Sequence, residues 1–585
     1  MRKSNYDKFP TIEVSASADA AVSHWVNIAS RLRQSLEHTA TTRTVLVIEC
    51  YPGVDESAVE LALSEHLRPV LSLRASTALL PPAQIDALVA PFLGADDPVF
   101  GFLCGLQLPQ FFDIERLEAL RGRLKEVTNG LILVVGCGAR LLAPGDVFVY
   151  ADLARWEAQL RFRRQESGNL GVANQQLAAG LKYKRAYFVD WRVADRWKRP
   201  LLAQADFFLD THQPAEPKLA EGAAIRRGWR EAVASPFRVV PFFDPAPWGG
   251  QWMKEVCDLD RGARNYGWCF DCVPEENSLL LRCGSTIVEL PSIDLVFDQP
   301  KALLGEAVHG RFGDEFPIRF DFLDTMGGGN LSFQVHPVTE YIQHHFGMHY
   351  TQDESYYLLA ASPGASVYLG LKEGIDPHAM LDDLARAKAG GAPFQVDRYA
   401  NRWPAKPHDH FLIPAGTVHC SGAESMVLEI SATPYIFTFK LWDWSRVGLD
   451  GKPRHTHLDH GAANICWERT TSWTKRHLIN AFSPVSSGEG WNEERTGLHQ
   501  REYIETRRHR FTGTVPHHTQ GGVQVLNLVA GEEAVVESPT GKFRPFIVHY
   551  AETFIVPAAV GAYTIRPHGP ATGLECMTMK AFVRT

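Results

Sequence analysis

The stretch Gly329-Asn330-Leu331-Ser332-Phe333-Gln334-Val335-His336-Pro337 decides the fold class of the middle of this chain. Apolar and polar side chains alternate along it from Leu331 to His336, the period of two that indicates a half-buried β-strand. Gln334 and His336 are two residues apart, so both project from the same face of that strand. An amide oxygen and an imidazole nitrogen on one face are ligands of the kind that a divalent metal ion binds.

Two more candidate ligands lie at the ends of later apolar runs. Glu354 opens the run Glu354-Ser355-Tyr356-Tyr357-Leu358-Leu359, and His419 closes the run Phe411-Leu412-Ile413-Pro414-Ala415-Gly416-Thr417-Val418-His419. Short alternating runs separated by Gly, Pro and Asn fill the region around them, which is typical of a β-sandwich or barrel. Two oxygen donors and two imidazoles inside a barrel would suit zinc and leave room for a substrate oxygen.

These motifs, in their order and spacing, resemble those of the type I phosphomannose isomerases, which belong to the cupins. The resemblance starts near Pro247-Trp248-Gly249-Gly250 and extends to the C-terminus through LSFQVHP, IPAGTVH and LEISATPYIFTFKLWDW. In that family the matching residues hold one zinc ion. The resemblance therefore implies one Zn²⁺ with four ligands: Gln334, His336, Glu354 and His419. The alternative is four satisfied polar residues inside a jelly roll.

Three positions depart from the family pattern. The family interconverts an aldose and a ketose phosphate by moving a proton between C1 and C2, and basic side chains neutralise the phosphate. At three of those basic positions this chain has Asp321, Gln352 and Lys440. We predict that Lys440 is catalytic, either as the proton carrier or by stabilising the enediolate, and that the substrate contacts Asp321, Gln352 and His349. A buried phosphate facing Asp321 would lose much of its electrostatic binding.

The sequence thus predicts a zinc-dependent sugar isomerase whose partner is a small carbohydrate with its phosphate absent or held differently. A true mannose-6-phosphate isomerase is the first alternative. A sugar-binding regulator without turnover is the second, because fold alone does not establish catalysis. His455, His457 and His460 either form a second metal cluster or belong to a basic loop.

The N-terminal third has a different pattern. Thr44–Cys50 and Gly130–Gly136 are β-branched apolar runs that alternate with helical segments, which indicates an α/β layer with a parallel sheet. This order resembles, more loosely, a nucleoside-kinase or P-loop domain. Where a phosphate loop would end in Gly-Lys-Ser/Thr, this chain has Asp55-Glu56-Ser57, and two carboxylates would repel a triphosphate. We predict a degenerate loop with no nucleotide-binding residues; a bifunctional kinase–isomerase is the competing hypothesis.

The C-terminal part repeats the barrel pattern without the ligands. The turn before Ala562 echoes the one before Cys420, but Gly561 stands where His419 would be. We therefore predict a multi-domain fold of one α/β domain and two β jelly-roll (cupin) domains, the first with a helical insertion at Asp376 to Ala389. The predicted division is 1–240 for the kinase-like domain, 241–470 for the metal-binding catalytic domain and 471–585 for the domain without metal.

Charge and composition exclude some functions. The 585-residue chain has a net charge of -8, which gives no general attraction to nucleic acid or to an anionic membrane. No apolar run is long enough to span a bilayer. Its 10 cysteines are scattered, with no disulfide framework. We expect a cytoplasmic protein, and a homo-oligomer is compatible with these features.

Overall fold

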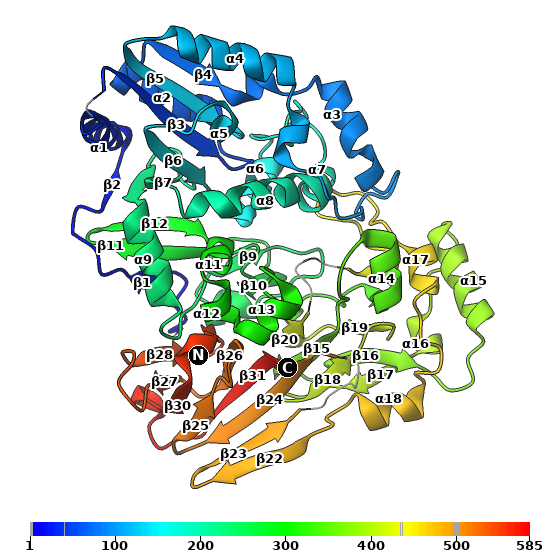
Figure 1. Ribbon diagram of the computed structural model, residues 1–585. Coiled ribbons are helices and arrows are strands. Elements are labelled where there is room, and N and C mark those ends of the chain that lie inside the picture. The colour runs from blue at the N-terminus through cyan, green and yellow to red at the C-terminus, as the bar shows by residue number, and fades with distance from the viewer. Residues whose placement is uncertain (1–3, 40, 433–434, 436, 497–501) are drawn as a thin grey trace. The chain divides into compact units, whose positions relative to one another are not determined.

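The computed structural model describes residues 4–39, 41–432, 435, 437–496 and 502–585, and the chain forms two compact units (Figure 1). The N-terminal unit consists of Thr11–Ala232 and Glu276–Gln299. The barrel unit contains the segment that ends at Pro10, together with Val233–Glu275 and Pro300–Thr585. The chain is therefore a multi-domain protein of mixed α and β structure, as predicted.

A seven-stranded sheet forms the centre of the N-terminal unit. Its order is β2 (Ala21–Ser23), β8 (Lys218–Glu221), β7 (Phe207–Asp210), β6 (Val147–Asp152), β3 (Arg43–Cys50), β5 (Gly130–Gly136) and β4 (Leu71–Arg74). The five strands from β7 to β4 are parallel, β8 pairs antiparallel with β7, and β2 pairs antiparallel with β8. Parallel strands are buried on both faces, which explains the continuous apolar runs that the sequence shows.

Helices connect these strands. They are α1 (Trp25–Glu37), α2 (Glu56–Leu67), α3 (Pro82–Val89), α4 (Ile114–Glu126), α5 (Ala139–Leu142), α6 (Arg155–Arg163), α7 (Ala179–Arg185), α8 (Trp191–Leu202), α9 (Gly222–Ala232) and α11 (Ser292–Asp298). Asp55 and Asp113 cap α2 and α4 by accepting hydrogen bonds from backbone N–H groups of the first turn. In the part of the chain that the structure describes, no helix combines the length and the apolarity needed to cross a membrane.

One strand lies in a different sheet from the one that the sequence suggests. The alternating run at 278–281 reads as part of the central barrel, but it forms β11 (Ser278–Cys283) in the N-terminal unit. There it pairs in parallel with β1 (Thr11–Glu13) and in antiparallel with β12 (Thr286–Pro291). A period of two identifies a strand but does not choose its partner. The predicted three-domain division itself stays a prediction.

The first sheet pair of the barrel unit carries the four predicted metal ligands or directly precedes them. One sheet consists of β18 (His410–Ile413), β15 (Glu354–Ala361), β20 (Ser425–Ser431), β13 (Arg319–Asp324), β10 (Trp268–Cys272) and β9 (Phe242–Asp244). The other consists of β17 (Ala400–Pro404), β16 (Ser366–Leu371), β19 (His419–Ser421), β14 (Phe333–Val335) and β21 (Phe439–Trp442). Helix α15 (Pro377–Lys388), capped by Asp376, lies where the helical insertion is predicted.

The second sheet pair encloses an apolar core. One sheet consists of β22 (Ser483–Gly488), β23 (Trp491–Arg495), β24 (Ile504–Phe511), β31 (Cys576–Val583), β26 (Gln524–Ala530) and β29 (Thr553–Val556). The other consists of β25 (Val515–His518), β30 (Ala562–Pro567), β27 (Glu533–Glu537) and β28 (Phe546–His549). Leu526 and Leu528 of the first sheet pack with Val536 and Tyr563 of the second. The number of jelly rolls stays a prediction.

Short helices link the strands of the barrel unit. They are α10 (Trp252–Val256), α12 (Pro300–Leu304), α13 (Glu306–Phe312), α14 (Thr339–Phe346), α16 (Val396–Tyr399), α17 (Leu458–Ala462) and α18 (Thr471–His477). Helix α14 directly follows the stretch that contains Gln334 and His336, and α17 packs on β21.

Candidate metal centre

Strand register turns three of the predicted site residues toward one face. Gln334 of β14 pairs directly with His419 of β19 on one side and with Lys440 of β21 on the other. Residues that are directly opposite in neighbouring strands share a face of the sheet. Gln334, His419 and Lys440 therefore project together.

Glu354 comes from the other sheet and joins the two histidines. Its Oε2 lies 3.2 Å from His336 Nε2, and its Oε1 lies 2.9 Å from His419 Nε2. Gln334 Nε2 lies 3.2 Å from His419 Nε2. All four side chains are buried, and one ligand atom from each of His336, Glu354 and His419 lies within 4.8 Å of the other two. The structure thus brings together the four residues that the sequence singles out.

The two histidines are oriented for metal binding. Nδ1 of His336 lies 2.7 Å from the carbonyl oxygen of Phe437, and Nδ1 of His419 lies 2.9 Å from that of Thr417. A carbonyl accepts a hydrogen bond, so each Nδ1 carries a proton and each Nε2 faces the cluster. Among the described residues, His336 Nε2 and Glu354 Oε1 are buried and have no hydrogen-bond partner. Two imidazoles and a carboxylate with such atoms fit a borderline divalent ion such as zinc.

Glu354, His336 and His419 shift one another's pKa values. Burial opposes ionisation of Glu354, but the adjacent His336 and His419 outweigh it and hold the pKa of the carboxyl well below its usual range. Burial also acts against a charge on His336, yet Glu354 raises the pKa of that imidazole. Burial, together with the nearby His336, lowers the pKa of His419. The carboxylate is thus held in its ionised form, as a metal ligand must be.

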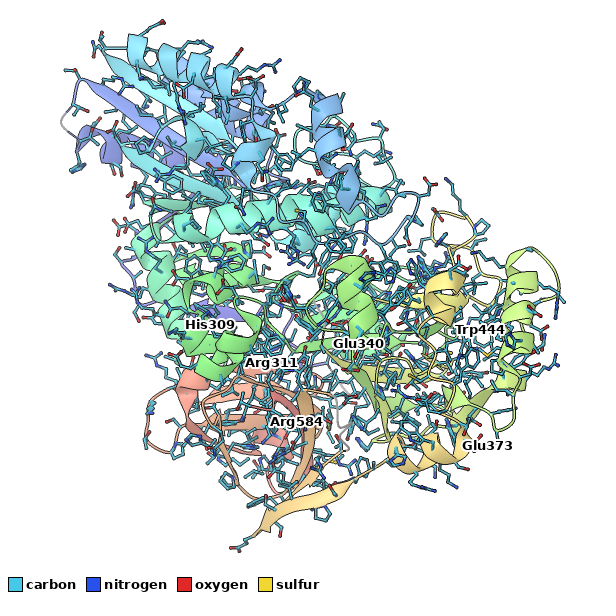
Figure 2. The ribbon with its side chains drawn as sticks, turned by 45° about the vertical axis from the view of Figure 1, so that its right-hand side comes forward. His309, Arg311, Glu340, Glu373, Trp444 and Arg584 are labelled. Carbon is cyan, nitrogen blue, oxygen red and sulfur yellow. The ribbon has the colours of Figure 1, made fainter. Side chains whose placement is uncertain are left out.

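Lys440 lies beside this cluster in a cationic setting. Burial, together with Arg454 and Arg446, lowers its pKa to about 8, against the opposing effect of Asp443. Asp443 pairs with Arg446 at 2.5 Å and with Arg454 at 2.7 Å. The loop after β21 is tied back to the segment just before β14, because Trp444 (Figure 2) donates from Nε1 to the carbonyl of Leu331 at 2.5 Å. A lysine in this position is available as a proton carrier.

The predicted substrate-binding residues lie in three different environments. Asp321 is fully buried, and its Oδ2 accepts a hydrogen bond from Arg319 Nε at 2.7 Å. Gln352 is buried and donates to Glu354 Oε2 at 3.0 Å. His349 is exposed, and the structure does not bring it into the cluster of ligand atoms. Substrate contacts for Asp321 and His349 stay predictions.

Sequence reasoning missed the surroundings of Asp321. Burial raises the pKa of Asp321 to about 6 although Arg319 opposes this shift. Across the sheet Asp321 pairs with Glu429, which pairs in turn with Tyr356, so all three line one face. Arg319 is two residues before Asp321 on a strand, and that spacing is the one signal that could have revealed the ion pair.

The three histidines between 455 and 460 are the residues of the possible second metal cluster. His455 and His457 have ring centroids 4.6 Å apart, and His460 Nδ1 lies 2.7 Å from Tyr341 Oη. Among the described residues, these histidines do not form a group of three that could hold a metal ion. The second-metal reading therefore has no support in the structure.

In the N-terminal unit, carboxylates occupy the predicted phosphate loop. Asp55 Oδ1 accepts from the N–H groups of Ser57 and Ala58, both at 3.0 Å. Glu56 Oε1 accepts from the N–H of Cys137 at 2.7 Å. At the start of α2, two N–H groups that could hold a phosphate are thus already bound by the chain's own Asp55 carboxylate.

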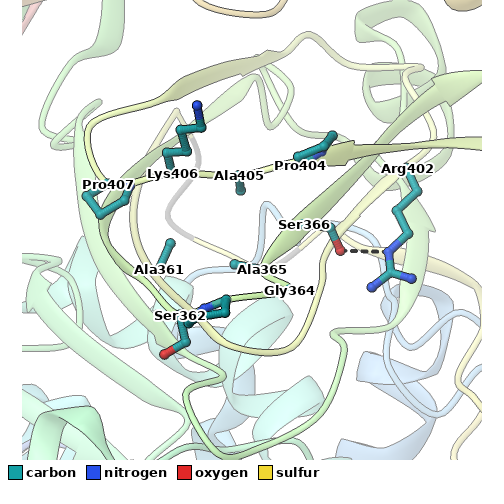
Figure 3. A pocket seen from close by; sticks show the side chains of 11 residues that line it. Ala361, Ser362, Gly364, Ala365, Ser366, Arg402, Pro404, Ala405, Lys406 and Pro407 are labelled. Atoms are coloured by element: carbon teal, nitrogen blue, oxygen red, sulfur yellow. Dashed lines mark hydrogen bonds between the residues drawn. The ribbon is translucent and has the colours of Figure 1, made fainter.

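A separate hollow of about 510 Å³ lies at the far end of β15 (Figure 3). Its lining includes Ala361, where β15 ends, together with Arg402 and Lys406. Glu354 begins the same strand, and eight residues of β-strand extend roughly 23–26 Å. The hollow is therefore distinct from the cluster around Glu354.

Comparisons with known proteins assign the family. Residues 24–234 match a protein-family model described as "Domain of unknown function (DUF8485)". Mannose-6-phosphate isomerase ManA of Bacillus subtilis is 30% identical over 252 residues, which cover 42% of this chain and 72% of that protein. The mannose-6-phosphate isomerase of Streptococcus mutans is 24% identical over 214 residues, which cover 36% of this chain and 62% of that protein.

Solved structures include mannose 6-phosphate isomerase from Bacillus subtilis, at 18% identity with a TM-score of 0.47, covering 59% of this chain and 99% of that chain. Because that TM-score is below 0.5, the assignment rests on the sequence relatives. The match to ManA, at 30% identity over 72% of that protein, is sufficient to assign the family. This chain belongs to the mannose-6-phosphate isomerase family.

Proposed function

We propose that the chain is a metal-dependent sugar isomerase that moves a proton between C1 and C2 of an aldose and its ketose. The observation that carries the proposal is the buried convergence of His336, Glu354 and His419, with Lys440 on the same face as Gln334. The names of the sequence relatives, which are mannose-6-phosphate isomerases, support the same class of reaction.

Each site residue has a role in this proposal. One Zn²⁺ would be held by four residues: Gln334, His336, Glu354 and His419. When bound, it supplies a Lewis acid that stabilises negative charge developing on the sugar oxygens. Lys440, as the neutral amine, accepts the proton from one of the two carbons and returns it to the other. Burial of the cluster keeps bulk water away from the reacting carbons.

The surroundings of the cluster favour a sugar without a phosphate, or with its phosphate held away from Asp321. The Asp321 carboxylate already pairs with Arg319, and the Gln352 amide is bound to Glu354. Neither position supplies a free positive charge for a phosphate dianion. Mannose 6-phosphate itself is the second candidate substrate, and the names of the relatives favour it.

Activity on a panel of sugars distinguishes an unphosphorylated substrate from mannose 6-phosphate. Wild type and Lys440→Ala would be compared on phosphorylated and unphosphorylated aldoses and ketoses, with exchange of solvent deuterium into C2 as a second readout. We expect the highest kcat/KM on an unphosphorylated sugar and loss of exchange in the variant. A clear preference for mannose 6-phosphate would overturn the substrate proposal and keep the isomerase. Absence of exchange with every sugar would favour a sugar-binding regulator instead.

For the N-terminal unit we propose no phosphoryl transfer, because Asp55 and Glu56 fill the loop where a triphosphate would sit. Calorimetry with ATP and magnesium tests this proposal. We expect no binding at millimolar ATP. Binding that disappears in a variant of the 49–57 loop would support the bifunctional kinase–isomerase.

A further inference from the structure

The side chain of Gln352 lies between two parts of the candidate metal centre. Its Nε2 donates to Glu354 Oε2 at 3.0 Å, and its Oε1 accepts from the N–H of Phe437 at 2.8 Å. Gln352 is 3% exposed, so neither hydrogen bond is exchanged with bulk water. The amide thus joins the lead-in to β15 with a segment that lies 85 residues further along the chain.

Only one orientation of the amide satisfies both neighbours. A backbone N–H can only donate, and an ionised carboxylate can only accept. Gln352 therefore presents its oxygen to Phe437 and its nitrogen to Glu354. A side chain with only donors, or with only acceptors, loses one of these two interactions.

The same peptide segment also holds a histidine. The carbonyl oxygen of Phe437 accepts from His336 Nδ1 at 2.7 Å, while His336 Nε2 lies 3.2 Å from Glu354 Oε2. The contacts therefore form a closed ring that runs from Glu354 to Gln352, to Phe437, to His336 and back to Glu354. Groups that hold metal ligands from behind usually set their orientation and their affinity for the metal.

We propose that Gln352 is a positioning residue that fixes two metal ligands at once, Glu354 directly and His336 through the Phe437 peptide. This inference rests on the proposed metal site and replaces the predicted contact of Gln352 with substrate. A lysine at this position could donate to Glu354 but could not accept from Phe437. The glutamine therefore builds a bridge that the family's lysine cannot build.

Zinc release from the loaded full-length protein to a chromophoric chelator tests the proposal. Gln352→Met removes both hydrogen bonds and should release zinc about 10- to 100-fold faster than wild type. Gln352→Lys keeps only the donor, so its rate of zinc release should lie between those of wild type and Gln352→Met. Gln343→Met is the matched control, because Gln343 is exposed and donates to the carbonyl of His349 instead; it should leave the rate unchanged.

Hydrogen–deuterium exchange of the peptide that contains Phe437 supplies a readout independent of zinc release. Exchange should accelerate in Gln352→Met and Gln352→Lys, which lose the acceptor, and stay slow in Gln352→Glu, which keeps it. Zinc release within twofold of wild type in the methionine and lysine variants overturns the inference. A raised KM with unchanged zinc release and exchange overturns it too, because that result marks a substrate contact. A wild-type protein that takes up no metal instead refutes the proposed function.

Discussion

The two sheet pairs of the barrel unit are built alike but filled differently. In the first pair, the turn before Cys420 ends in His419, whose Nε2 faces Glu354 at 2.9 Å. In the second pair, Gly561 occupies the corresponding position, with a φ of +75° that favours glycine. The second pair encloses an apolar core in which Leu526, Leu528 and Tyr563 are fully buried. The interior of the first pair presents a group of three possible metal ligands, whereas the second pair is centred on an apolar core.

The second pair nevertheless has its own polar cluster, which lies around Glu493. Glu493 lies 3.1 Å from Arg507, 3.1 Å from His509 and 3.2 Å from Lys580, all through Oε1. Its other oxygen accepts from Ser486 at 2.8 Å. In the first pair, Glu354 Oε1 and His336 Nε2 have no hydrogen-bond partner among the described residues. Polar groups thus converge in both interiors, and His517 Nε2 of the second pair is also buried without a hydrogen-bond partner. Among the described residues, only His336, Glu354 and His419 form a group of three possible metal ligands.

The largest expected effect follows from removing a metal ligand of the first pair. His419→Ala should lose bound zinc and lower turnover by on the order of 10³-fold or more, because metal stabilisation of developing charge is worth several kcal/mol. Elemental analysis and turnover on the best substrate of the panel measure both effects. His509→Ala in the second pair is the control and should keep metal and turnover. Full metal content in His419→Ala would remove it from the ligand set.

Two lysines, half-buried Lys440 in the first pair and buried Lys580 in the second, provide the next test. Lys440→Ala should lower turnover by about 10²- to 10⁴-fold with zinc retained, as expected when a proton carrier is removed. Lys580→Ala should leave turnover unchanged and cost about 1–3 kcal/mol of unfolding free energy, because Glu493 loses a donor. Turnover and chemical denaturation of both variants provide the comparison. Near-wild-type turnover of Lys440→Ala would show that another group carries the proton.

A cavity in the second pair tests whether that interior serves only packing. Leu528→Ala should lower the unfolding free energy by about 2–5 kcal/mol, since Leu528 is fully buried in the apolar core. Zinc content and KM should stay at wild-type values. A change in KM without a loss of stability would mean that the second pair contributes to substrate binding.

The smallest expected effect concerns acid stability of the first pair. Burial, with Arg508 nearby, lowers the pKa of His410 to about 3, against roughly 6.5 in the unfolded chain. The folded pKa is the lower one, so this stability is complete above pH 6.5 and is lost as the pH falls toward 3. In wild type, this histidine makes the unfolding free energy fall by about 1.4 kcal/mol for each pH unit of acidification. His410→Phe should abolish that part of the pH dependence.

Denaturation of metal-free protein between pH 5.5 and 4.5 measures the slope, because the unfolded imidazole is almost fully protonated there and the folded one is not. In the second pair, burial lowers the pKa of His509 to about 4, so His509→Phe should act with the same sign over a narrower range. Parallel slopes for wild type and His410→Phe would mean that His410 accepts a proton in the folded protein.

The four metal-ligand candidates could be named from the sequence. A period of two places Gln334 and His336 on one face, and the resemblance to the family motifs implies the full set with Glu354 and His419. The sequence could not place the partners of those residues. Arg319 neutralises Asp321 from two residues away, and Gln352 reaches a backbone N–H 85 residues further on. Strand pairing was also hidden: the run at 278–281 has the pattern of a barrel strand but joins β1. The local sequence pattern indicates which residues share a face of a strand. These contacts depend instead on which distant segments of the chain lie side by side in the fold.

The interleaved order of the two units affects how the protein is made. Lys198 is completely buried in the N-terminal unit between Asp152 of β6 and Asp294 of α11, at 2.6 and 2.5 Å. The ribosome completes Ala232 well before it reaches Asp294, and at 5–20 residues per second the interval lasts on the order of 3 to 12 s. Until then the nascent unit lacks β11, β12 and one of the two carboxylates that balance its buried ammonium. We expect this interval to be the stage of synthesis at which the chain depends most on chaperones, and a gene truncated after residue 234 to yield an insoluble product.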